Sequence, residues 1–196
     1  MTDPLKMVIA QLSRFPGIGE RTSRRLVYWL LQQDPRVSKE IGQAISDLTE
    51  TLRRCQRCFN LSNKEFCNIC ANEKRSPQSI CVVERPQDIA SIESTGEFKG
   101  TYHVLDGVIS PLDGIGPDQL RIRELLMRLK DEKINEILVA TDPDTEGDAT
   151  AMYLAQLIRP LGPKITRLAH GIAVGTELGY ANRNTLACAV LNRREI

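Results

Sequence analysis

Four cysteines have the spacing of a metal site. Cys55 and Cys58 are separated by two residues, and after an eight-residue gap Cys67 and Cys70 repeat that spacing. Each pair can direct two thiolates at one ion, and two pairs complete the tetrahedron that structural Zn²⁺ prefers. The alternative is two disulfides, which need an oxidising compartment that no other feature of the sequence indicates. The spacing therefore predicts structural zinc held by all four cysteines.

A second set of ligand-type residues is acidic. Glu84 ends one apolar run, and Asp142, Asp144 and Glu146 directly follow another. If both runs are parallel strands, their carboxyl ends meet at one edge of a sheet, where ligand sites gather. Carboxylate oxygens suit a hard ion, so Mg²⁺ is a candidate ligand here. A structural role is the alternative, because acidic side chains also stabilise the N-terminus of a helix.

Two glycines and three arginines indicate contact with an anion. Gly17 and Gly19 lie between two predicted helices, and Arg21, Arg24 and Arg25 fall in the first turns of the second helix. Glycines permit a tight turn, and the unpaired N–H groups at a helix N-terminus bind phosphate. An ordinary corner between packed helices would also use the glycines. The arginine cluster favours DNA contact, through phosphates and without sequence preference.

The predicted secondary structure is helical in the N-terminal part of the chain and alternates between strands and helices after it. Helical spacing predicts three N-terminal helices, over residues 5–14, over residues 20–33, and from an N-cap at Ser38 to Leu52. Beyond residue 78, short apolar runs alternate with helical patterns. We expect strands at 80–84, 102–105, 134–141 and 165–169, and helices at 86–94, 122–133 and 146–161. Strands without polar alternation predict a parallel sheet covered on both faces.

The predicted fold is therefore a multi-module α+β protein. We divide it into a helical region over residues 1–54, a cysteine module over 55–70, an α/β domain over 78–173 and a helical tail over 174–196. The tail carries apolar residues that could cover the sheet or contact a neighbouring subunit.

Composition indicates the cellular compartment of the protein, and the charge distribution indicates which part of the chain would contact a polyanion. The sequence is 41% hydrophobic, and no apolar run approaches the ~20 residues that span a bilayer. Residues 1–4 lack the basic and apolar regions of a signal peptide, so we expect a cytoplasmic protein. Residues 1–58 hold 10 basic and 6 acidic residues, and residues 59–196 hold 16 and 19. We therefore expect any polyanion contact in the N-terminal part.

The motifs and their order resemble a known family. The Pro-Gly-Ile-Gly turn before Glu20 resembles the helix-hairpin-helix of DNA-repair proteins, and the acidic strand ends resemble those of the Toprim fold. With the cysteine pairs between them, this order is similar to that of RecR, a family of bacterial recombination mediators. The segments 110–117 and 169–175 are also similar to RecR sequences.

The resemblance implies a non-enzymatic, DNA-binding mediator of recombinational repair. Such proteins work with RecO and RecF to help RecA replace single-strand-binding protein at gaps, as dimers and as ring-shaped tetramers that encircle DNA. Carried over to this sequence, the resemblance implies zinc on the four cysteines and partner contact by the acidic set. It implies DNA contact at the turn and at one face of the following helix, through Gly17, Gly19, Arg21 and Arg25.

A Mg²⁺-dependent Toprim nuclease or topoisomerase-like enzyme is the alternative function. The acidic set supports this alternative, but none of the four tyrosines has an identifiable activating neighbour that would make it a nucleophile. His103 and His170 also lack a nucleophilic partner at a recognisable spacing, and we interpret both as packing residues.

Overall fold

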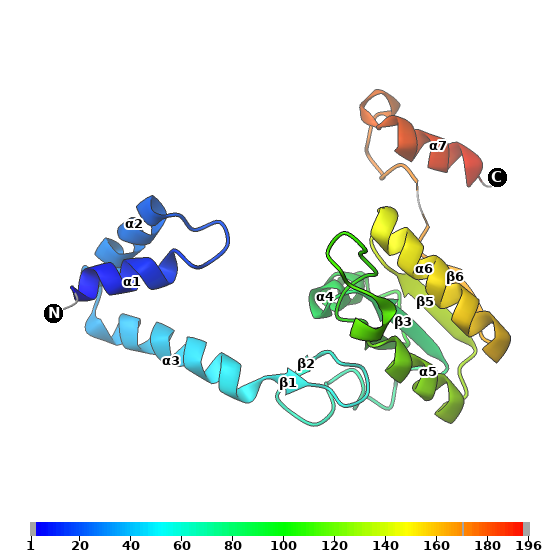
Figure 1. The fold of residues 1–196 in the computed structure, drawn as a ribbon, viewed down its shortest axis with the longest axis horizontal. Helices are drawn as coiled ribbons and strands as arrows, with labels where there is room; N and C mark the ends of the chain where they lie inside the picture. The colour runs from blue at the N-terminus through cyan, green and yellow to red at the C-terminus, as the bar shows by residue number, and fades with distance from the viewer. Residues whose placement is uncertain (1–2, 170, 194–196) are drawn as a thin grey trace. The chain divides into compact units, whose positions relative to one another are not determined.

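The computed structural model describes residues 3–169 and 171–193, so His170 lies outside the described residues. The chain divides into two compact units. The first ends at Leu52 and the second begins at Arg53. Figure 1 shows helices alone in the first unit and a sheet flanked by helices in the second. Among the helices within the described ranges, none is long and apolar enough to cross a membrane.

The first unit consists of α1 (Pro4–Leu12), α2 (Glu20–Leu31) and α3 (Pro35–Thr51). An aspartate caps α1 and α3 just before the proline that begins each helix, a favourable pairing because proline has no N–H to satisfy. The Asp34 carboxylate accepts the N–H of Arg36 at 2.8 Å. The third helix therefore begins at Pro35, and the predicted N-cap at Ser38 is wrong: the Asp34-Pro35 step that ends α2 also starts α3.

Packing in the first unit joins α1 and α2, which lie side by side (Figure 1). Ile9 of α1 and Val27 of α2 are buried. No residue of α3 is buried, and its apolar row Ile41, Ile45 and Leu48 is 42–56% exposed. The periodicity predicted the helix correctly, but its apolar face lacks a cover within the described part of this chain.

A four-cysteine module, residues 53–72, begins the second unit. Strand β1 (Arg53–Arg54) pairs antiparallel with β2 (Leu61–Ser62), so the first cysteine pair lies in the turn that joins them. The Phe59 N–H donates to the Cys55 carbonyl at 3.0 Å and closes this turn. Phe59 itself has a positive φ of 63°, a left-handed conformation that is uncommon for an aromatic residue.

The sheet domain, residues 79–167, has the parallel sheet that the sequence predicts. Its strands are β3 (Ser79–Val83), β4 (Thr101–Val104), β5 (Glu136–Ala140) and β6 (Lys164–Arg167), in the order β4-β3-β5-β6 with all pairs parallel. The connections contain α4 (Pro86–Thr95), α5 (Ile122–Asp131), α6 (Thr145–Ile158) and the 3-10 turns η1 (Pro117–Gln119) and η2 (Arg159–Leu161). The α+β fold class is confirmed.

Both faces of this sheet are covered, as parallel strands require. On one face Ile80 and Val82 join a core cluster with residues of α5 and α6. On the other face Cys81 and Val83 cluster with Ile89 of α4. Two side chains of the four-cysteine module, from Phe59 and Ile69, pack against this second cluster. The module therefore supplies part of the cover of the sheet.

The tail contains the 3-10 turn η3 (Leu178–Tyr180) and α7 (Arg183–Leu191). The Asn182 side chain caps α7 by accepting the N–H of Thr185 at 2.8 Å. No residue of α7 is buried in this chain, and Tyr180 and Leu191 are 84% and 79% exposed.

Candidate functional site

The four cysteines meet at one point. Their sulfur atoms all lie within 4.8 Å of one another, and the Cys58 and Cys67 sulfurs are 3.5 Å apart. In a tetrahedral site with Zn–S bonds of about 2.3 Å, sulfurs lie about 3.8 Å apart, so this arrangement fits Zn²⁺. Three of the four are buried, and none forms a disulfide. The predicted structural zinc site is confirmed.

Hydrogen bonds within the cluster favour the thiolate form of one sulfur. The Cys58 and Cys67 sulfurs are in hydrogen-bond contact, and the Cys70 N–H donates to the Cys67 sulfur at 3.5 Å. These contacts hold the pKa of Cys67 below its usual range and raise that of Cys58. Zinc ligands must be thiolates, so binding of the ion releases the protons that remain.

A backbone contact and a double ion pair fix the first cysteine pair to the edge of the sheet. The Val104 N–H of edge strand β4 donates to the Cys58 carbonyl at 2.9 Å. Between the cysteines, Arg57 binds both oxygens of Glu132 at 3.0 and 2.8 Å. Arg128, 7% exposed, also binds Glu132 and reaches the Tyr102 carbonyl at 2.7 Å. Because Arg57 and Arg128 both pair with Glu132, the energetic cost of burying these charged groups is lowered.

An aromatic contact completes the attachment. The Phe59 ring meets His103 of β4 edge-on at 5.4 Å between centroids, and the Arg121 guanidinium lies 4.8 Å above Phe59. His103 is fully buried, and its Nε2–H donates to the Arg121 carbonyl at 2.8 Å. Burial lowers the pKa of His103 to about 4, so the ring is neutral near pH 7. His103 is therefore a packing residue, as the sequence indicated.

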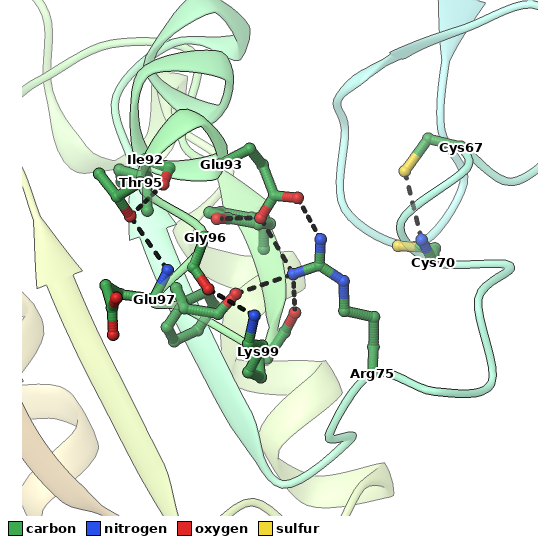
Figure 2. A network of polar contacts seen from close by, with 12 residues as sticks. Cys67, Cys70, Arg75, Ile92, Glu93, Thr95, Gly96, Glu97 and Lys99 are labelled. Atoms are coloured by element: carbon green, nitrogen blue, oxygen red, sulfur yellow. Dashed lines mark hydrogen bonds and ion pairs between the residues drawn. The ribbon is translucent and has the colours of Figure 1, made fainter.

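Figure 2 shows how the segment after the second cysteine pair is held. Arg75 forms a two-oxygen ion pair with Glu93 of α4 and donates to the Phe98 carbonyl at 3.0 Å. The Tyr102 hydroxyl donates to the same carboxylate at 2.6 Å. Burial alone would raise the pKa of Glu93, but the hydrogen bonds from Arg75 and Tyr102 hold it below its usual range. Arg75 was not predicted as a functional residue, and its only signal in the sequence is its position close to the cysteines.

The glycine turn of the first unit has the predicted form. Gly17 has a φ of +78°, which favours glycine, and Gly19 is the N-cap of α2 in extended backbone. Gly19 has no side chain, so no N-cap side chain accepts the first N–H groups of α2, which a helix leaves without an intrahelical partner. Buried Ser23 braces the turn, because its hydroxyl lies 2.8 Å from that of Ser13 and 3.1 Å from the Gly19 carbonyl. Neither serine was predicted from the sequence.

The arginines of α2 differ in their partners. Arg24 pairs with Glu20 at 2.8 Å. Within residues 3–169 and 171–193, no salt bridge involves Arg21 or Arg25, and both are exposed. These two residues are one helical turn apart, in the N-terminal half of α2.

The acidic residues have structural partners in this fold. Buried Glu84 accepts the Asp142 N–H at 2.7 Å, which ties the ends of β3 and β5 together. Burial, with the charges of Asp142 and Asp144 nearby, raises the pKa of Glu84. Asp144 caps α6 by accepting the Gly147 N–H at 2.7 Å, and a Cβ at Gly147 would lie 2.2 Å from the Asp142 carbonyl. Glycine is thus required for this close approach.

Glu146 lies beside a serine rather than beside the other acids. Its carboxylate accepts the Ser110 hydroxyl at 2.5 Å. In the part of the chain that the structure describes, the four cysteines form the only group of three or more side chains gathered closely enough to hold a metal. The geometry therefore does not support Mg²⁺ at the acidic set.

Matches to family models cover the whole of this architecture. The models describe a RecR helix-hairpin-helix over residues 5–49, a RecR zinc finger domain of the four-cysteine type over 52–72, a Toprim domain over 78–169 and a RecR C-terminal region over 171–194. Together with the cysteine cluster and the parallel sheet, these matches define a class of protein that joins a helix-hairpin-helix, a zinc finger and a Toprim domain.

Curated relatives match over nearly the full length of both chains. Recombination protein RecR of Myxococcus xanthus is 48% identical over 99% of this chain and 98% of the relative. The RecR proteins of an Anaeromyxobacter species and of Streptomyces coelicolor are 47% and 49% identical, over 100% and 95% of this chain and 99% and 94% of theirs. The chain belongs to the RecR family.

Proposed function

We propose that this protein is a DNA-binding mediator of recombinational repair that acts in the bacterial cytoplasm. The observation that carries the proposal is the N-terminal half of α2. There, N–H groups without a side-chain cap occur together with exposed Arg21 and Arg25, which form no ion pair within the described residues. Relatives of near-equal length that are named recombination proteins support the biological process.

In the proposed interface, a phosphate binds the first N–H groups of α2, and Gly17 and Gly19 let the DNA backbone approach. The partial positive charge of the helix end favours an anion. Arg21 and Arg25 would add one charged contact each on the same side of the helix. Phosphate contacts position a protein without reading bases, so binding is expected to be independent of sequence.

Self-association would convert these modest contacts into stable retention. We propose dimers and a ring-shaped tetramer, in which the exposed apolar row of α3 and the exposed tail around α7 meet other subunits. Several weak phosphate contacts on one closed assembly raise avidity through effective concentration. The zinc site would hold the cysteine module rigid against the sheet domain.

The acidic side of the sheet domain is proposed to contact partner proteins rather than to catalyse a reaction. One carboxylate oxygen of Glu84 and one of Asp144 accept a backbone N–H, which suits a structural role. We propose that exposed Asp142 and half-buried Glu146 meet RecO, and that RecF joins the same pathway toward loading RecA at single-stranded gaps. The proposal includes no catalytic residue.

DNA binding by the Arg21→Ala/Arg25→Ala variant tests the interface. Loss of two phosphate contacts should lower the slope of log affinity against log salt by about 1.4 to 1.8, which corresponds to roughly 25- to 60-fold weaker binding at 0.1 M salt. The measurement is a fluorescence-anisotropy titration over a salt series with unrelated oligonucleotides.

Two matched controls make the test specific. Arg24→Ala removes an arginine that pairs with Glu20, and Arg123→Ala removes an exposed arginine of the sheet domain. Both should bind DNA with nearly unchanged salt dependence. Unchanged affinity of the double variant would exclude the α2 N-terminus as the DNA site.

A further inference from the structure

The solvent side of α2 carries two aromatic side chains in addition to its arginines. Tyr28 and Trp29 are 50% and 48% exposed, whereas Ser23 and Val27 form the buried side of the same helix. Tyrosine and tryptophan are enriched at binding surfaces because each buries a large area on contact. The two rings therefore lie on a side of α2 that is open to a ligand in this chain.

These aromatic residues continue the row that Arg21 and Arg25 begin. Trp29 lies four residues after Arg25 and eight after Arg21. Tyr28 lies three and seven residues after the same arginines. Residues at these spacings share one face of a helix, and four residues rise about 6 Å along its axis. Two cations and two aromatic rings thus form one exposed stripe on α2.

This stripe combines the two kinds of side chain that bind single-stranded nucleic acid. Basic groups contact the phosphates, and aromatic rings stack on unpaired bases. In a duplex the bases are already paired and stacked inside the double helix, so only the phosphates could use the stripe. A second copy of the chain placed on the stripe by a two-fold axis would bring its own arginines close, and like charges repel. The charge therefore favours an anionic occupant.

We propose that the two aromatic rings of the stripe, Trp29 foremost, stack on unpaired bases of single-stranded DNA whose phosphates bind Arg21 and Arg25. The inference rests on the proposed DNA contact at α2 and adds a base contact that selects single strands over duplex. Every base has an aromatic face, so stacking leaves binding independent of sequence.

Trp29 is the only tryptophan of the chain, so its fluorescence reports on this site directly. Stacking on a base quenches the emission of an indole ring. Titration with oligothymidine should therefore quench the fluorescence. An abasic strand of the same length has the phosphates without the bases, and it should bind more weakly and leave the emission nearly unchanged. Equal quenching by both strands, or no quenching by oligothymidine, would overturn the inference.

Variants of α2 give a second readout, in which fluorescence anisotropy measures affinity for labelled oligothymidine and for duplex. Trp29→Ala should weaken single-strand binding about tenfold and change duplex binding less than about twofold. Trp29→Phe keeps an aromatic ring and should recover most of the loss. Leu31→Ala is the matched control, because Leu31 is a 68% exposed apolar residue of α2 that lies off the stripe, two residues after Trp29.

The outcomes separate this inference from the proposed function. Absence of binding to single-stranded and duplex DNA by the unmodified protein would overturn both. If Trp29→Ala weakened binding of the two DNAs equally, or of neither, the base contact would be wrong and the arginines would remain the proposed DNA site. A changed oligomer mass of Trp29→Ala in light scattering, with unchanged single-strand affinity, would assign Trp29 to subunit contact and would also overturn the inference.

Discussion

At the scale of single residues, the structure distinguishes side chains that the sequence presents as equivalent. Three arginines lie in the first turns of α2, but Arg24 is paired with Glu20 while Arg21 and Arg25 have no ion-pair partner in the described ranges. His103 and Arg128 are buried polar residues, but no pattern in the surrounding sequence marks either of them as buried. Burial and partners decide what each side chain can do.

His103 should make stability depend on pH in a defined window. Its pKa is about 4 in the folded protein and about 6.5 when unfolded, so the unfolded chain gains a proton first as pH falls. The free energy of unfolding should therefore fall by about 3 kcal/mol between pH 6.5 and pH 4 from this group alone. More than about one pH unit above the unfolded pKa of 6.5, both states are neutral and the contribution is fully present.

The His103→Gln variant isolates this effect. Glutamine can still donate to the Arg121 carbonyl but does not titrate, so its stability should fall less over the same window. Urea unfolding at successive pH values measures both proteins, and protonation of the zinc ligands is common to the two curves. Parallel curves for the two proteins would contradict the assignment of the pH dependence to His103.

At the scale of elements, the cysteine module packs against the sheet and is not an independent domain. The Val104 N–H of edge strand β4 donates to the Cys58 carbonyl, and Phe59 packs against His103. An uncovered edge strand would expose unpaired N–H groups. Zinc thus stabilises the edge of the sheet through the turn that carries its first two ligands.

Removal of zinc should loosen that edge before the centre of the sheet. In the metal-free protein, hydrogen exchange at the Val104 amide should accelerate at least about tenfold, because a structural ion supplies folding free energy to the turn. The amides of the central strand β5 should remain protected. Hydrogen-exchange mass spectrometry after chelation, with Cys58→Ser as a second route to the same state, measures the difference. Unchanged protection at Val104 would show that the turn stays attached without metal.

At the scale of the whole molecule, charge and exposed apolar surface are divided along the chain. Basic residues predominate up to Cys58, whereas residues 59–196 have a net negative charge. The first unit and the tail leave apolar side chains uncovered, including Leu48 and Leu191. This division agrees with the proposed assembly, in which one part would hold DNA, another would contact partners, and the exposed apolar rows would contact further copies of the chain.

A closed ring should be retained on DNA that has no ends. On closed circular duplex in high salt, the tetramer should remain bound at least about tenfold longer than on linear duplex, because dissociation from a circle requires the ring to open. Gel filtration of loaded DNA measures retention, and light scattering gives the oligomer mass. Cutting the loaded circle with a restriction enzyme should release the protein.

Equal retention on circular and linear DNA would indicate an open binding surface instead of a ring. Cleavage of either DNA by the protein with Mg²⁺ or Mn²⁺ would contradict the proposal that the protein acts without a catalytic step. The Asp142→Asn variant is the control for such cleavage, since this residue belongs to the acidic set that an enzyme would use.

Much of the fold follows from the sequence because its signals are local. Two-residue spacing brings cysteine sulfurs to one ion, and apolar runs without polar alternation predicted strands β3, β4, β5 and β6. The glycines at positions 17 and 19 predicted the turn because the backbone at Gly17 needs a positive φ. Each of these features depends on neighbours within a few residues.

Other features depend on contacts between residues far apart in the chain, which no local pattern in the sequence reveals. The sequence placed Glu84 and Asp142 at one sheet edge. In the structure one Glu84 oxygen accepts the Asp142 N–H, and the acidic set does not gather closely enough to hold an ion. The pairing of Arg57 with Glu132 spans 75 residues and leaves no local pattern. A side chain's partners are set by packing of distant elements, so the sequence determined the modules and the zinc ligands, whereas tertiary packing determined which charged groups remain available.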